Sequence, residues 1–111
     1  MGHNSYDPDH VFRELEEAAE RMTDFEAQAN QMDEMKKPVL ASLTLDHMKS
    51  EKSRAMAETR ALADPSYETH IIGMIEARRK SNRAKAHYHN MRALADARRT
   101  QEASIRALTR P

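Results

Sequence analysis

The chain has 111 residues, no cysteine, 5% aromatic residues, and 18 acidic and 18 basic side chains. The lack of cysteine excludes disulfides and Cys-ligated zinc, and no run approaches the roughly 18–20 apolar residues of a membrane span. Much of the apolar content is Ala and Met, so we expect paired helices with a narrow seam. These features predict a cytoplasmic protein with one all-helical domain over residues 9–111, no cofactor, no metal and no membrane contact.

Charge is sorted along the chain. Residues 1–35 carry ten acidic and two basic side chains, whereas residues 76–111 carry three acidic and ten basic ones. The neutral total therefore conceals two oppositely charged ends, which either attract each other or bind separate partners.

The first predicted helix covers residues 9–36, after a disordered arm at residues 1–8. Asp7-Pro8 is a typical helix start, with Asp as the cap and Pro at the first helical position. Apolar residues then recur at spacings of three and four, as in a heptad seam: Val11, Leu15, Ala18, Met22, Phe25, Ala29 and Met32. Pro38 is expected to end or kink this helix.

Two more helices are predicted, over residues 42–63 and 65–108. The second has a weaker seam: Ala41, Leu45, Met48, Lys52, Ala55, Thr59 and Leu62. Asp64-Pro65 repeats the start signal, so we expect a reversal there. The third helix has the longest seam: Ile71, Met74, Ala77, Ala84, Tyr88, Met91, Ala95, Ile105 and Leu108. Gly73 within it indicates a close backbone approach.

The preferred fold is a long antiparallel helical hairpin or coiled coil with a kink near Pro38. With Asp64 at the tip, residue i faces residue 129 − i, which places Phe25 near Ile105 and the acidic arm against the basic arm. A three-helix bundle is the alternative.

The main candidate site is the basic part of the third helix. A helical stripe of cations suits a phosphate backbone, and an aromatic side chain can stack on an exposed base. The candidate nucleic-acid-binding residues are Arg78, Arg79, Arg83, Lys85, Tyr88, Arg92, Arg98 and Arg99. Four of the basic residues recur every seven positions: Arg78, Lys85, Arg92 and Arg99. A solvated face, or one neutralised by the first helix, is the competing interpretation.

The first helix carries an acidic face made of Glu16, Glu17, Glu20 and Asp24. Such a row of carboxylates can mimic the charge of a nucleic acid and bind a partner protein, or it can simply be solvated. His87 and His89 point about 200° apart on a helix, so they cannot share a metal. No phosphate loop or catalytic triad pattern is present.

The stretch from Ala77-Arg78-Arg79 to Arg98-Arg99-Thr100-Gln101-Glu102-Ala103 resembles small helical proteins encoded by phages and prophages. The opening Met1-Gly2-His3-Asn4 is similar to that of many short prophage proteins. The resemblance covers mainly residues 62–108. It implies an accessory role near single-strand annealing recombinases and single-strand-binding proteins, in the cytoplasm of a phage's host cell.

These observations predict a non-enzymatic accessory protein whose basic third helix contacts single-stranded DNA or a recombination partner. One alternative is a protein-interaction module that inhibits a host defence or nucleic-acid enzyme with its acidic helix as a DNA-like decoy. Another is a structural coiled-coil subunit of a homo-oligomer.

Overall fold

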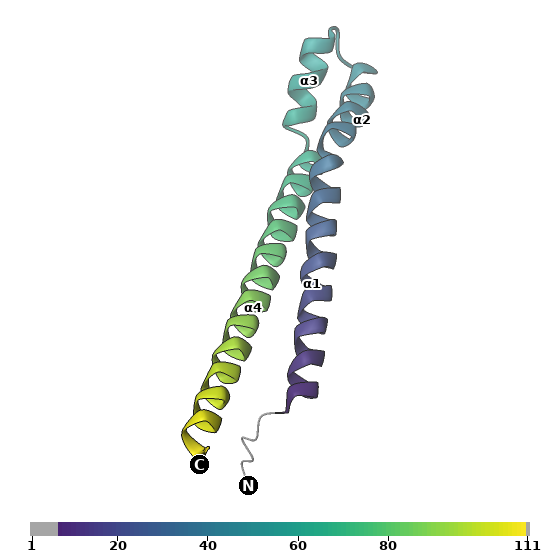
Figure 1. The fold of residues 1–111 in the computed structure, drawn as a ribbon. Helices are drawn as coiled ribbons and strands as arrows, with labels where there is room; N and C mark the ends of the chain where they lie inside the picture. The colour runs from purple at the N-terminus through teal and green to yellow at the C-terminus, as the bar shows by residue number, and fades with distance from the viewer. Residues whose placement is uncertain (1–6, 111) are drawn as a thin grey trace. The chain divides into compact units, whose positions relative to one another are not determined.

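The structure is a computed structural model that describes residues 7–110. This range forms helices and no strand: α1 (Pro8–Glu34), α2 (Lys36–Met48), α3 (Arg54–Leu62) and α4 (Pro65–Thr109) (Figure 1). The predicted all-α hairpin class is confirmed. The predicted disordered arm falls almost wholly outside the described residues, and α1 already begins at Pro8.

Contacts along the chain define two compact units. Unit 1 combines the start of α1, up to Thr23, with α4 from Asn82 onward. Unit 2 comprises residues 24–81, and it therefore contains α2, α3 and the adjoining parts of α1 and α4. Each unit is an antiparallel helix pairing.

The start of α1 follows the predicted capping pattern. Asp7 accepts a hydrogen bond from the Asp9 backbone N–H at its Oδ1 (3.1 Å) and one from the Val11 N–H at its carbonyl oxygen (3.1 Å). Pro8 occupies the first helical position, where its missing N–H costs nothing. Every residue of the predicted seam of α1 is half-buried or buried, and Ala18 and Ala29 are fully buried.

The long first helix bends near Pro38, as predicted. Only Met35 separates α1 from α2, and its own dihedral angles are helical. Met35 donates to the Gln31 carbonyl (3.0 Å) and accepts from the Val39 N–H (2.9 Å), so hydrogen bonding continues across the junction. Pro38 has no N–H to offer the carbonyl one turn earlier, and this places the break just ahead of the proline.

The second predicted helix is wrong, because the chain reverses within it. α2 ends at Met48, and a polar turn at residues 49–53 leads into α3. Ser53 caps α3 by accepting a hydrogen bond from the Met56 N–H (3.2 Å). Arg60 pairs with Glu51 (3.1 Å), which ties α3 to the turn.

Asp64 is therefore a junction in the returning arm and not the tip of the hairpin. Its Oδ1 accepts from the Ser66 N–H (2.8 Å), which caps α4 with Pro65 at the first position. Its Oδ2 accepts from His47 Nε2 (2.8 Å), so the α3–α4 junction is fixed to the end of α2. The backbone hydrogen bond from Ser66, and then the His47 bond, lower the pKa of the Asp64 carboxyl.

The early reversal shifts the register away from the predicted one. His70 Nε2 donates to the Met32 carbonyl (3.0 Å), and Arg78 contacts both Asn30 and Asp33. Facing residue numbers in unit 2 thus add up to between 102 and 111, and not to 129. The predicted register, in which residue i faces residue 129 − i, is accordingly wrong for unit 2.

Small side chains fill the seam. The buried residues of the described chain are all small: Ala18, Ala29, Thr44, Ala57, Ala61, Ser81 and Ala95. The third predicted seam is confirmed from Ile71 to Ala95, whereas Ile105 and Leu108 are exposed. Every residue of the second predicted seam is exposed, because Thr44, Ala57 and Ala61 form the real one.

Candidate nucleic-acid interface on α4

The candidate interface lies in unit 1, where the part of α4 from residue 82 to 109 packs on the start of α1. Ala18 and Ala95 are buried in this pairing, and Tyr88 and Met91 are half-buried. Leu94, on another side of α4, is 55% exposed. The pairing therefore fixes which side chains of α4 face outward.

Three of the four basic residues that recur every seven positions already have partners within the protein. In unit 2, Arg78 pairs with Asp33 (2.6 Å) and donates to Asn30 Oδ1 (3.0 Å). Lys85 is half-buried and has a polar partner, and Arg99 pairs with Asp96 one turn earlier. These contacts reduce what these side chains can offer a phosphate group.

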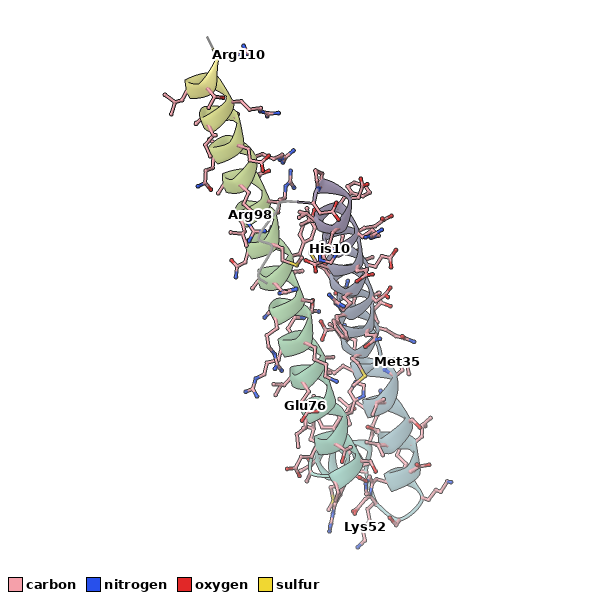
Figure 2. All side chains as sticks on the ribbon, turned by 90° about the horizontal axis from the view of Figure 1, so that it is seen from below. His10, Met35, Lys52, Glu76, Arg98 and Arg110 are labelled. Carbon is pink, nitrogen blue, oxygen red and sulfur yellow. The ribbon has the colours of Figure 1, made fainter. Side chains whose placement is uncertain are left out.

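The other arginines of α4 in unit 1 are more available. Arg83, Arg92 and Arg98 are exposed, and none forms an ion pair with another residue that the structure describes. Arg79, which belongs to unit 2, is also exposed. Figure 2 shows Arg98 beside the first turns of α1 and Arg110 just after the end of α4.

The two helical segments of unit 1 carry opposite charge. Residues 82–109 hold six basic and two acidic side chains, and residues 7–23 hold six acidic and two basic ones. The predicted neighbourhood of acidic and basic arms is thus present within unit 1, in the corrected register. Because few of these charges form ion pairs, the unit has a cationic side and an anionic side.

The acidic face predicted on α1 is exposed. Glu16, Glu17 and Glu20 in unit 1, and Asp24 in unit 2, form no ion pair with a described residue. The nearby Glu14 pairs instead with His10 (2.8 Å) on the same helix. These four carboxylates remain accessible to a partner.

A shallow groove of unit 1 contains an aromatic residue that the sequence interpretation missed. Phe12, 67% exposed, lines this groove together with Tyr88, Arg92 and Arg99. Tyr88 is half-buried there and makes an edge contact with His89, with ring centroids 5.5 Å apart. Phe12 is more exposed than Tyr88. Its position outside the apolar seam of α1 could have identified it from the sequence as an exposed aromatic residue.

The histidines do not gather at this site. Within residues 7–110, no three His, Asp or Glu side chains are arranged to hold a metal ion. His47 and His70 are used in hydrogen bonds of unit 2, and His10 pairs with Glu14.

Comparison with protein-family models, with curated proteins and with solved structures found no match. None of the helices that the structure describes combines the length and apolar character needed to cross a membrane.

Proposed function

We propose that the chain is a non-enzymatic binding protein whose α4, between residues 82 and 109, contacts single-stranded nucleic acid. The supporting observation is the exposure of Arg83, Arg92 and Arg98 without an acidic partner among the described residues. Exposed cations along a helix attract phosphate groups and release counterions on binding. The sequence resemblance adds the phage-type accessory role to this proposal.

The groove beside these arginines favours single strands. Only an unpaired base can present its face to a side chain, and stacking of that kind contributes about 1–3 kcal/mol per base. Phe12 is exposed next to Arg92, so a base stacked on the ring keeps its phosphate near the guanidinium. Tyr88 is less suited, because it is half-buried in the pairing with α1.

The test is a titration of a labelled oligonucleotide at several salt concentrations, followed by fluorescence anisotropy. The R92Q/R98Q variant should bind more weakly, and its salt slope should fall by about 1.4, or 0.7 for each phosphate that is no longer neutralised. The R13Q/R21Q variant is the matched control, because it removes two charges from α1 of the same unit. Equal effects of the two double variants, or no binding at low salt, would refute the proposal.

A second function is supported by the exposed acidic face of α1. Glu16, Glu17 and Glu20 present a row of unpaired carboxylates that can enter the basic groove of a nucleic-acid enzyme. A charge reversal of these three residues should abolish capture of that enzyme and leave the helicity unchanged. Undiminished capture by the reversed variant would exclude the decoy function.

A further inference from the structure

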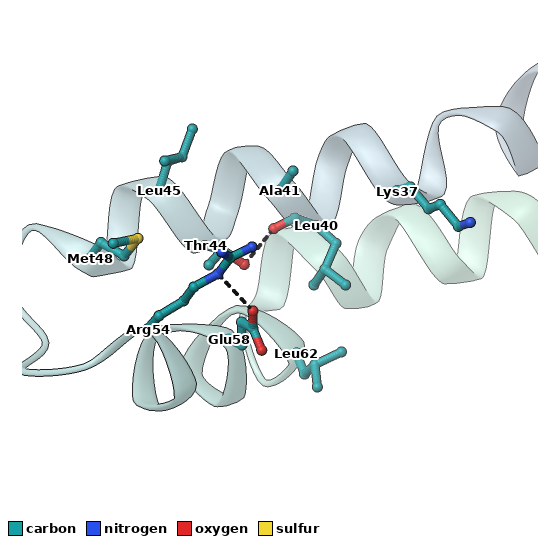
Figure 3. Close-up of a pocket in the computed structure, with 9 residues that line it drawn as sticks. All are labelled: Lys37, Leu40, Ala41, Thr44, Leu45, Met48, Arg54, Glu58 and Leu62. Atoms are coloured by element: carbon teal, nitrogen blue, oxygen red, sulfur yellow. Dashed lines mark hydrogen bonds and ion pairs between the residues drawn. The ribbon is translucent and has the colours of Figure 1, made fainter.

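A groove in unit 2 lies between α2 and α3. It has a volume of about 570 Å³ and is lined mainly by apolar side chains: Leu40, Ala41, Leu45, Met48 and Leu62. Figure 3 shows Ala41 and Leu45 on α2 and Leu62 on α3 among the lining residues. Leu45 is 65% exposed, and Leu62 is 56% exposed. This groove plays no part in the proposed nucleic-acid contact.

The buried core of unit 2 consists of small residues, whereas the larger Leu45 and Leu62 are exposed. The buried residues of this unit are Ala29, Thr44, Ala57, Ala61 and Ser81. Small side chains bury little apolar area, and hydrophobic stabilisation scales with that area. The exposed apolar face of this helical hairpin is therefore typical of a surface that another apolar surface covers.

We propose that a second copy of this chain occupies the groove, so that two α2–α3 hairpins form a four-helix bundle. The occupant must be present whenever the chain folds, because the hairpin lacks a large core of its own. A second copy is present wherever the chain is made, and it occupies the groove when the concentration exceeds the dissociation constant. In a two-fold symmetric dimer, each copy also covers the apolar groove of the other copy.

The charges at the edge of the groove agree with a self-complementary contact. Lys37 and Arg54 are cationic, and Glu58, which pairs with Arg54 (3.1 Å), is anionic. Figure 3 shows Arg54 and Glu58 reaching between the two helices. Two-fold symmetry lets Glu58 of one copy approach the partner's Lys37, and the reverse. A purely anionic ligand would instead meet Glu58 and an apolar floor.

The main test measures the mass of the full chain in solution by light scattering over a range of concentrations. The unchanged chain should be a dimer, and L45E should be a monomer. A buried unpaired carboxylate should raise the dissociation constant by more than about 100-fold. L94E is the matched control, because Leu94 is 55% exposed on α4 of unit 1. It should remain a dimer. A monomeric unchanged chain, or a dimer that L45E leaves intact, would overturn the proposal.

A second measurement stays informative if L45E unfolds. Because the chain has no cysteine, a single introduced thiol can form disulfides only between copies. L45C should yield covalent dimers on mild oxidation, and D46C, on the next and differently directed residue of α2, should not. Equal crosslinking of the two variants would show that this face is not the contact.

Discussion

The two units bury the same kind of residue but expose different kinds. In unit 1, Ala18 and Ala95 are buried in the helix pairing, and the exposed residues of α4 include arginines such as Arg83 and Arg98. In unit 2, Ala57 and Ala61 are buried, and the exposed residues of α2 include Leu45 and Met48.

This difference shows how one pairing mode can serve two kinds of contact. A seam of small residues lets two backbones approach closely and leaves the larger side chains pointing outward. Charged side chains in that position suit a phosphate backbone, whereas leucine and methionine suit another protein surface. We therefore expect nucleic acid at unit 1 and protein at unit 2.

The largest effect on stability is expected from enlarging a buried seam residue. Ala57 is fully buried, so leucine has no room there, and A57L should lower the free energy of unfolding by about 1–3 kcal/mol. A55L is the control, because Ala55 is exposed on the same helix, and its effect should stay within about 0.5 kcal/mol. Urea denaturation followed by circular dichroism measures both. Similar effects of the two variants would contradict close packing at the seam.

The junction at Asp64 gives unit 2 an acid-sensitive element. Its carboxyl has a lowered pKa, caused first by the hydrogen bond from the Ser66 backbone and then by His47. A carboxyl of this kind stabilises the fold fully above its ordinary pKa, and the contribution is lost as pH falls through the folded pKa. We therefore expect the melting temperature to decrease when the pH is lowered below about 4.

Two substitutions separate the contribution of the Asp64 charge from that of its helix-capping hydrogen bond. D64N keeps a capping side chain and removes the charge, whereas D64A removes both. At neutral pH the melting temperature should fall by a few degrees at most in D64N and further in D64A. Both variants should lose the acid-dependent step of the unchanged chain. An unaltered step in D64N would mean that another carboxyl causes it.

The sequence predicted the first helix well because its pattern is local and unbroken. The Asp7-Pro8 cap and the spacing from Val11 to Met32 each depend on one helix alone. The same is true of the third seam between Ile71 and Ala95. Heptad spacing identifies the face that a helix buries whenever a single face is apolar.

The second helix was mispredicted because it has two competing faces. Leu45 and Met48 look like seam residues by size, but the smaller Thr44 is the residue that is buried against α3. Hydrophobicity alone favours the larger residues, and close helix packing favours the smaller ones. The polar run at residues 49–53, ending in the capping Ser53, was the local signal for the reversal.

The basic site stays a prediction, but the structure shows that some of its arginines already have partners within the protein. Heptad spacing grouped Arg78 with Arg99, yet both form ion pairs. The partner of Arg99 lies on the same helix, whereas the pairing of Arg78 with Asp33 depends on the register of the neighbouring helix. That register follows from the position of the reversal, which the sequence interpretation had placed at Asp64.

The smallest expected effect concerns Gly73, the glycine inside α4. A Cβ at this position would lie 2.7 Å from the terminal methyl of Met32, and no backbone atom lies that close. The methionine end can rotate away at little cost, whereas glycine inside a helix costs up to about 1 kcal/mol relative to alanine. G73A should therefore be neutral or stabilising by less than about 1 kcal/mol in urea denaturation. A clear loss of stability would show that the two helices approach more closely at Gly73 than at the alanine seam. The double variant G73A/M32A would then recover stability only if the methionine caused the clash.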